Sequence, residues 1–232
     1  MLQHIRLLIF DLDYLVFDCA ILKVKALRQG LISLADAIPQ SVRVPDVSDA
    51  EEGFSNYGFR WARFLEIGLN EETLEHLQQA YRIHEDRLIE SEVGRVYPGI
   101  EAFITNCRQE NTAIALGAEA SRDYLVAVND RHQLDNLFQI ALCTEEFGIG
   151  EADEMFGEIL YQAEVNPSET LALGTRSHYF QAAHNQDILT VGCGWGIRQQ
   201  DGLSEADLIA PTLFELMPTI RKADHLASQC SR

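Results

Sequence analysis

The fold is decided by the stretch Leu8-Ile9-Phe10-Asp11-Leu12-Asp13-Tyr14-Leu15-Val16-Phe17-Asp18, an apolar run that ends in carboxylates. A short and nearly continuous apolar run is typical of a strand that is buried on both faces of a sheet. In open α/β sheets, ligand-binding and catalytic groups gather at the carboxyl ends of the strands. Asp11 and Asp13 are therefore candidate functional residues, with solvated strand-end aspartates as the structural alternative.

Similar apolar runs alternate with stretches of helical periodicity through the rest of the chain. Strands are predicted at residues 5–10, 112–116, 139–143, 171–173 and 188–193, and helices at residues 99–109, 121–132, 152–164 and 177–185. Strands and helices in alternation are typical of a parallel sheet with helices on both faces. The sequence therefore predicts an α/β fold with a mostly parallel sheet.

Residues 19–95 interrupt this alternation with a different pattern. No convincing strand is present, and apolar side chains recur at helical spacing, as at Leu74 and Leu77. Asn70, followed by two glutamates, is a typical helix start, and Gly94 is the predicted stop. We therefore expect a helical insert after the first strand.

Composition excludes several classes of protein and partner. The 232 residues carry 36 acidic and 18 basic side chains, a formal net charge of −18, and 47% of them are hydrophobic. That apolar fraction is ample for a buried core, and the negative charge disfavours nucleic acid and anionic membranes as partners. The apolar stretch in residues 1–10 is too short for a signal peptide, and no window of about 18 residues is apolar throughout.

The five cysteines are scattered, with no CxxC pair. This pattern favours reduced thiols, and we expect a cytoplasmic protein. Cys143 and Cys193 lie inside apolar runs, so both are predicted to be buried.

Around the two aspartates the chain resembles the haloacid dehalogenase (HAD) superfamily, specifically its phosphoglycolate phosphatase-like and β-phosphoglucomutase-like branch. Members of that branch begin with a strand that ends in Asp-x-Asp-Gly-Thr-Leu-x-Asp-Ser, which corresponds here to residues 11–19. Tyr97-Pro98-Gly99 resembles the segment at which the family's chain returns to its core. The resemblance implies a HAD-like Rossmannoid core at residues 1–17 and 96–232, with an all-helical cap inserted at residues 18–95.

The resemblance also implies roles for the two aspartates. In active relatives the first aspartate attacks a phosphoryl group to form an aspartyl phosphate, and the second protonates the leaving group and then activates water. By position, Asp11 would be the nucleophile and Asp13 the acid/base. If Mg²⁺ is bound, Asp11 and Asp13 are its expected ligands, and it would bring the anionic carboxylate and the phosphate together.

The remaining family motifs are altered in this chain. Tyr14-Leu15 replaces the Gly-Thr of the first motif, where glycine permits a tight turn. The second motif lacks its hydroxyl, because residues 117–120 read Gly-Ala-Glu-Ala. Gly150 stands where the third motif has its lysine, and Thr175 and Tyr179 replace the metal-binding acids of the fourth motif.

Other basic and hydroxyl residues are candidates to rebuild a binding site. Arg176, in the loop of the fourth motif, could pair with Asp11 or Asp13 and replace the missing cation, since a guanidinium satisfies carboxylates with two parallel hydrogen bonds. A solvated loop arginine is the alternative. Ser121 and Arg122 follow the second motif as further binding candidates, with a helix N-cap and a solvated arginine as their structural alternative.

Three glutamates, Glu119, Glu145 and Glu146, could also supply oxygens to a metal, whereas His178 and His184 are expected on helix surfaces. The dehalogenase branch of the family, which uses its first aspartate without Mg²⁺, is a third alternative. It resembles this chain less, because its members have Asp-x-Tyr-Gly-Thr after the strand and keep both the hydroxyl and the lysine.

These departures favour a catalytically degenerate HAD-like protein that acts as a binding or regulatory module. We then expect no cofactor and no tightly bound Mg²⁺ at Asp11, and instead Arg176 or a water network beside the two acids. The alternative is a phosphatase-like HAD hydrolase with an atypical site, Asp11 as nucleophile, Asp13 as acid/base and Mg²⁺ as cofactor. A basic protein and a small-molecule ligand are the partners considered, because residues 145–169 hold eight acids and no Lys or Arg. A solvated acidic helix face is the alternative explanation of that segment.

Overall fold

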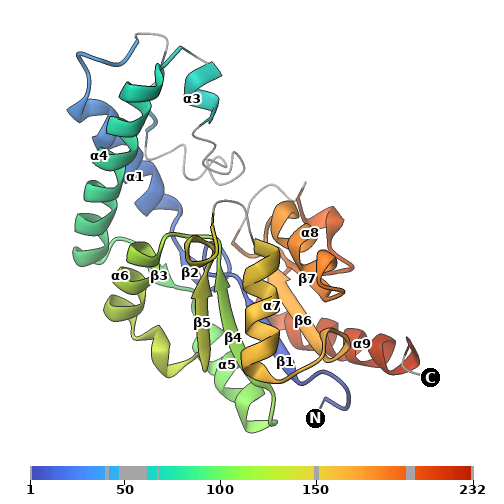
Figure 1. Ribbon diagram of the computed structural model, residues 1–232. Coiled ribbons are helices and arrows are strands. Elements are labelled where there is room, and N and C mark those ends of the chain that lie inside the picture. The colour runs from blue at the N-terminus through green and yellow to red at the C-terminus, as the bar shows by residue number, and fades with distance from the viewer. Residues whose placement is uncertain are drawn as a thin grey trace. The chain divides into compact units, whose positions relative to one another are not determined.

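The structure is a computed structural model that describes residues 2–39, 42–46, 62–66, 68–148, 152–196 and 202–230. The chain divides into two compact units, whose elements are labelled in Figure 1. The first unit consists of Met1–Asp18 and Val96–Arg232, and the second consists of Cys19–Arg95. The second unit is therefore an insertion between two parts of the first.

A six-stranded sheet, with every strand pair parallel, forms the centre of the first unit. Its order is β5-β4-β1-β6-β7-β8, so the first strand of the chain lies inside the sheet. The strands are β1 (Leu7–Phe10), β4 (Ala113–Ala118), β5 (Ile140–Cys143), β6 (Thr170–Gly174), β7 (Leu189–Cys193) and β8 (Leu208–Ala210). The predicted α/β class with a mostly parallel sheet is confirmed.

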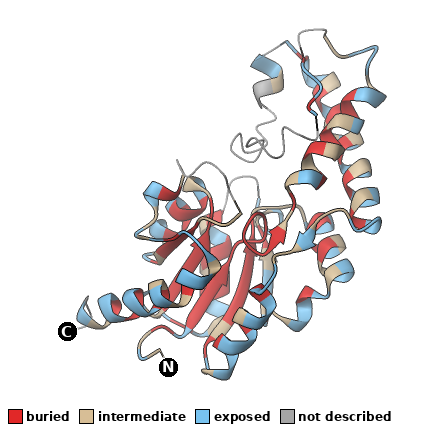
Figure 2. Cartoon of the chain, turned by 180° about the vertical axis from the view of Figure 1, so that it is seen from behind, coloured by how far each residue is buried: buried red, intermediate tan, exposed pale blue. Residues whose placement is uncertain are grey.

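Helices cover both faces of this sheet (Figure 1). They are α5 (Ile100–Gln109), α6 (Arg122–His132), α7 (Ala152–Ala163), α8 (Ser177–Asn185) and α9 (Leu213–Cys230), with 3₁₀ turns at Leu134–Asn136, Thr144–Glu146, Pro167–Glu169 and Leu203–Glu205. Leu7 and Ile9 of β1 pack in an apolar cluster with α7 and α8. Phe10 instead contacts Phe103 of α5, with the ring centroids 6.4 Å apart. The first strand is apolar throughout because both of its faces are covered, and Figure 2 shows the sheet as the buried centre of the unit.

Some elements of the structure were not predicted from the sequence. The edge strand β8 has only three residues, of which one is buried, so it gives no apolar run. The helix α9 was not predicted either. A second sheet pairs β2 (Phe17–Asp18) with β3 (Arg95–Val96), and two residues a strand are too few for any periodicity.

The helices described in the second unit are α1 (Ala20–Ser33), α3 (Ala62–Glu66) and α4 (Glu71–Glu90). An apolar cluster that includes Leu31 and Leu77 joins α1 to α4. Gly30 permits their close approach, because a Cβ at this position would lie 3.3 Å from Leu77 Cδ1.

The start of α4 is as predicted, but its end is not. The side chain of Asn70 caps the helix by accepting a hydrogen bond of 2.8 Å from the backbone N–H of Thr73. The helix ends at Glu90, before the predicted stop at Gly94. Glu92 adopts a left-handed backbone with φ of 60°, and the Ser91 hydroxyl donates to the carbonyl of Arg87, so the last turn is closed without glycine.

Four cysteines in the described part of the chain are free and buried, and they include Cys143 and Cys193 as predicted. Burial raises the pKa of the Cys107 thiol to about 12 and that of Cys143 to about 11, which keeps both protonated. Among the described residues, every helix is either too short or too polar to cross a membrane.

Asp224 of α9 ties the last helix to the start of the chain. Its Oδ1 accepts hydrogen bonds of 2.7 Å from the backbone N–H groups of His4 and Ile5, and its Oδ2 accepts one of 2.9 Å from Gln3. Burial would raise the pKa of Asp224, but these three donors outweigh it and lower the pKa. The ionised carboxylate therefore stabilises the entry into β1.

We predict that Asp224→Asn lowers the free energy of unfolding at pH 7 by about 2 kcal/mol, because hydrogen bonds to a charged group are the stronger kind. The native pKa lies below the unfolded value, so this stabilisation is present above about pH 4 and is lost as the pH falls through the native pKa. Urea unfolding at pH 7 and pH 3 measures both effects. The exposed Asp130→Asn is the control and should change stability by less than about 0.5 kcal/mol. Equal losses in the two variants would contradict this role of Asp224.

Candidate functional site

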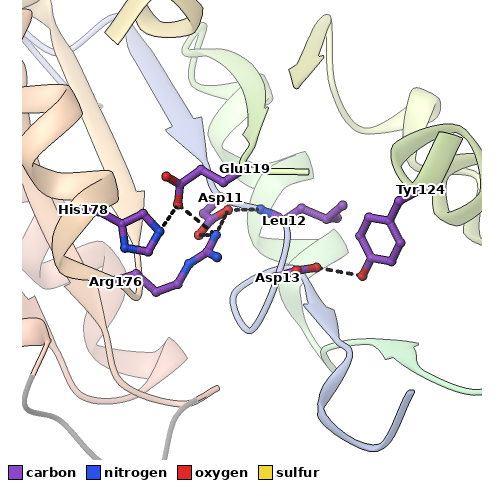
Figure 3. A network of polar contacts seen from close by, with 7 residues as sticks. All are labelled: Asp11, Leu12, Asp13, Glu119, Tyr124, Arg176 and His178. Atoms are coloured by element: carbon purple, nitrogen blue, oxygen red, sulfur yellow. Dashed lines mark hydrogen bonds and ion pairs between the residues drawn. The ribbon is translucent and has the colours of Figure 1, made fainter. Parts of the chain in front are cut away.

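The candidate site lies at the carboxyl edge of the sheet, where three neighbouring strands end. Asp11 follows β1, Glu119 follows β4, and Arg176 comes two residues after β6. The strands are in register, with Phe10 of β1 opposite Leu116 of β4 and Leu173 of β6. The register brings these loops together although they are far apart in the sequence (Figure 3).

An ion pair joins Asp11 to Arg176. Nη2 of Arg176 lies 2.9 Å from Oδ2 and 3.2 Å from Oδ1 of Asp11, so one nitrogen donates to both carboxylate oxygens. Asp11 is completely buried, and 19% of the Arg176 side chain is exposed. Asp11 Oδ1 also accepts a 2.8 Å hydrogen bond from the backbone N–H of Leu12. The predicted pairing of Arg176 with a strand-end aspartate is confirmed.

Glu119 extends the ion pair toward solvent. Its Oε2 lies 3.1 Å from the same Arg176 Nη2 and 2.7 Å from Nε2 of His178 (Figure 3). The contact with Arg176 is an ion pair, and the contact with His178 is one only when the imidazole is protonated. His178 is 55% exposed at its side chain, in agreement with its predicted place on a helix surface. The network therefore runs from a surface histidine to a buried aspartate.

Burial and neighbouring charges shift the pKa values of Asp11, Arg176 and Glu119 in opposite directions. Burial raises the pKa of Asp11 to about 6; Arg176 opposes this shift, while Glu119 and Asp13 add to it. Burial lowers the pKa of Arg176, but the same three carboxylates outweigh it and the net shift is upward. Burial also acts to raise the pKa of Glu119, yet Arg176 and His178 bring it below its usual value. Arg176 is therefore held as a fixed positive charge between two acids.

Asp13 has a different partner. Its Oδ1 accepts a hydrogen bond of 2.8 Å from the hydroxyl of Tyr124 on α6, and both residues are buried. Asp11 and Asp13 thus lie two positions apart but are held by different elements, Asp11 by the loop after β6 and Asp13 by α6 (Figure 3).

Tyr14 occupies the place of the family's glycine and keeps the backbone shape that glycine favours. Its φ is 64°, in the left-handed region, which costs a residue with a side chain roughly 1 kcal/mol. The loop after β7 covers this turn: Trp195 Nε1 donates to the carbonyl of Leu15 over 3.2 Å. A Cβ at Gly196 would overlap the carbonyl oxygen of Tyr14, so the loop requires glycine there.

The structure also tests the remaining residues that the sequence analysis considered for a binding site. Ser121 caps α6 by accepting from the N–H of Tyr124 over 3.3 Å, so its structural alternative as a helix N-cap is confirmed. The exposed Arg122 pairs with Glu146 and so differs from the solvated arginine given as its alternative. A binding role for the two residues stays a prediction. Gly150 and its neighbour Glu151 lie outside the described residues.

The positions of the fourth motif are buried. Thr175 and Tyr179 are almost inaccessible, and their hydroxyls have no hydrogen-bond partner among the described residues. His184 contacts Asp207 and Thr190, each at 3.0 Å, and serves to join α8 to the loop before β8.

The sequence analysis did not predict the roles of two residues of the site, Glu119 and Tyr124. Glu119 was considered only as a metal ligand, not as a partner of Arg176, and Tyr124 was not considered. The position of Glu119 three residues after the strand predicted at residues 112–116 is a usable signal. Tyr124 offers none, because a tyrosine near a helix start is commonly a packing residue.

Mg²⁺, which the resemblance implies, does not fit this donor set as it is arranged. The ion would need the oxygens of Asp11, and Arg176 Nη2 lies within 3.2 Å of both. The fourth-motif position holds the hydroxyl of Thr175 rather than a carboxylate. Within the described ranges, no three His, Cys, Asp or Glu residues are clustered so as to hold a metal ion.

Comparisons with known proteins agree with this fold. A family model described as haloacid dehalogenase-like hydrolase matches residues 8–193. The chain belongs to the haloacid dehalogenase-like hydrolases. No curated protein matches it.

Several solved structures share the α/β HAD-like fold over nearly the whole chain. A predicted phosphatase from Clostridium acetobutylicum is 17% identical, with 95% of this chain and 100% of that chain covered and a TM-score of 0.77. The β-phosphoglucomutase of Clostridium difficile is 21% identical, and the match covers 98% of this chain and 100% of that chain with a TM-score of 0.72. CbbY from Rhodobacter sphaeroides, in complex with phosphate, is 17% identical, and the match covers 91% of this chain and 96% of that chain with a TM-score of 0.71.

We predict that Asp11 titrates near pH 6 in the wild-type protein, as measured by ¹³C NMR of the carboxyl carbons. Glu119→Gln removes a negative neighbour and should lower this pKa, whereas Arg176→Ala removes the positive neighbour and should raise it. The folded pKa exceeds the unfolded one, so this group's contribution to stability is present below about pH 4 and is lost as the pH rises through 6.

The control for this titration is Glu146→Gln, which removes a carboxylate that pairs with Arg122 instead and should leave the Asp11 titration unchanged. Titration of wild-type Asp11 at or below about pH 4 would show that Arg176 outweighs burial and would contradict the prediction.

Proposed function

We propose that this HAD-family protein is a binding or regulatory module without metal-dependent phosphatase activity. One observation carries the proposal: the chain's own guanidinium lies against the aspartate that corresponds to the family nucleophile. An attacking carboxylate must approach the phosphoryl group closely, and Nη2 of Arg176 lies within 3.2 Å of both oxygens of Asp11, where that group would have to approach.

The altered motifs support the same proposal. Loss of a single charge-stabilising group typically slows a reaction by about 10²- to 10³-fold. This chain lacks the hydroxyl of the second motif, the lysine of the third and the acids of the fourth. Such losses do not add simply, but together they leave little stabilisation for a phosphoryl transition state.

A phosphatase-like hydrolase with an atypical site is the second candidate function. Family membership favours it, and the similar structures include a predicted phosphatase and a protein in complex with phosphate. In this candidate Asp11 is the nucleophile, Asp13 is the acid/base and Mg²⁺ is the cofactor. Arg176 would then have to leave Asp11 before a metal or a phosphate could approach.

A basic protein or a small-molecule ligand is the proposed partner, and the charges of the module favour the basic protein. Asp11, Asp13 and Glu119 together outnumber the positive charge of Arg176, so the site repels phosphate esters. The segment at residues 145–169 adds further acids. Several of them have local partners: Glu145 accepts from the N–H of Arg122, and Asp153 accepts from Asn185.

A turnover assay distinguishes the two candidate functions. Purified protein is incubated with a panel of phosphomonoesters in two separate conditions, one with roughly 5 to 10 mM Mg²⁺, at which weak metal sites fill, and one with EDTA. The Asp11→Asn variant is assayed in the same two conditions as the control. We expect no turnover above that of Asp11→Asn in either condition. Turnover that requires both Mg²⁺ and Asp11 would establish the hydrolase instead.

The partner is tested by a pull-down at low and high ionic strength. We expect a basic protein to be recovered at low salt and lost as salt rises, because exposed charges are screened over about 10 Å at 0.1 M. Neutralising Asp153, Glu154 and Glu158 together with Glu151 should abolish the recovery while the circular dichroism spectrum stays unchanged. Recovery that survives the four changes would leave the segment as solubilising surface.

A further inference from the structure

We infer that the C-terminal end of α7 is a docking site for an arginine side chain of a basic protein. The site consists of Tyr161, Glu164 and the carbonyl groups that end the helix. The inference rests on the basic partner of the proposed function and names the part of the acidic segment that binds it. The site lies a few residues before β6 begins at Thr170, whereas Asp11 lies at the opposite, carboxyl edge of the parallel sheet.

An open hollow of about 600 Å³ lies at this end of α7. It is lined by Leu160, Tyr161, Gln162, Glu164, Val165 and Asn166. Leu160 and Val165 are buried apolar side chains, and the other four residues are exposed. The hollow therefore offers a partner both apolar and polar contacts.

Tyr161 presents an aromatic ring to solvent beside this hollow. The residue is 79% exposed, and its side chain has no hydrogen bond or ring contact with any described residue. A single exposed aromatic is unremarkable by itself. The face of a tyrosine ring attracts a cation, however, and the ring of Tyr161 is open to one.

Glu164 brings a carboxylate to the hollow at a position that favours glycine. Its φ is 54°, in the left-handed region, and its N–H donates to the carbonyl of Tyr161 over 3.2 Å. The N–H of Val165 donates to the carbonyl of Leu160 over 3.3 Å, which completes a Schellman motif. Glycine would end the helix here with less strain, so the helix itself does not require the carboxylate. Within the described ranges, the side chain of Glu164 has no partner.

The end of the helix adds further negative potential. The carbonyls of Gln162 and Ala163 accept no backbone hydrogen bond from the part of the chain that the structure describes. Such carbonyls form the negative end of the helix dipole, which favours a cation. Residues 133–175 contain no Lys or Arg. Arg6 contacts the end of the segment, but it lies 3.5 Å from Glu169 and is paired there.

These features fit a guanidinium better than an ammonium group. A planar guanidinium can stack on the ring of Tyr161 while its N–H groups donate to the carboxylate of Glu164 and to the helix carbonyls. A lysine ammonium is a compact charge and is more strongly hydrated, so it gains less from the ring. The partner is therefore expected to present an arginine rather than a lysine.

The test titrates the ¹⁵N-labelled protein with acetyl-tetraarginine amide at low ionic strength and follows the backbone amides by NMR. We expect the largest shift changes at residues 160–166. A tetralysine peptide of the same charge should bind at least about twofold more weakly. Tyr161→Ala should weaken binding of the arginine peptide by about two- to fivefold, whereas Tyr161→Phe, which keeps the ring, should retain it.

Glu164→Gly separates binding from folding. The midpoint of thermal unfolding should stay the same or rise, because glycine adopts the left-handed conformation without strain. Binding of the arginine peptide should nevertheless weaken by about threefold or more, as in Glu164→Gln. Phe214→Ala, which removes another highly exposed aromatic, and Asp130→Asn, which removes another exposed acid, are the matched controls and should leave the affinity unchanged.

Two results would overturn the inference. One is a set of shift changes spread over the surface with no maximum at residues 160–166. The other is binding to Tyr161→Ala and Glu164→Gly that is as tight as binding to the wild type. Neither readout depends on turnover, so failure of the proposed function is recognised separately, by hydrolysis that requires both Mg²⁺ and Asp11.

Discussion

A carboxylate that is completely buried requires a counter-charge, and the rest of the site depends on how the chain supplies one to Asp11. Removing one partner of a buried ion pair typically costs about 3 to 5 kcal/mol, because the other charge is stranded. Arg176 meets this requirement and also contacts Glu119, so a single side chain holds together the loops after β1, β4 and β6. Ion pairs therefore connect these three loops at the carboxyl edge of the sheet.

The turn after β1 shows how a family backbone persists when its residues change. Tyr14 keeps a left-handed conformation that suits glycine, and its energetic cost is offset by burial of the aromatic side chain. The loop after β7 lies directly on this turn, since Gly196 has no room for a side chain beside Tyr14. The shape of this turn is thus set by close backbone packing.

How much could be predicted from the sequence depended on whether a feature is local or results from the sheet register. The apolar run at β1, the Asn70 cap and the helical period of α4 are local, and they predicted elements that the structure contains. The pairing of Arg176 with Asp11 was also predictable, because a charge two residues beyond β6 lies at the same edge as the end of β1. Glu119 and Tyr124 could not be assigned partners, since their contacts depend on which strands are neighbours and on the rotation of α6.

The central position of β1 has a consequence for the order in which the protein can fold during translation. β1 is made before its sheet neighbours β4 and β6, which emerge from the ribosome about 100 and 160 residues later, and Asp224, whose carboxylate fixes the residues before β1, is made later still. Contacts of such long sequence separation form slowly. The apolar strand β1 therefore stays without its partners while the chain between them is made, and a nascent chain of this kind depends on protection from aggregation until β4 and β6 have emerged.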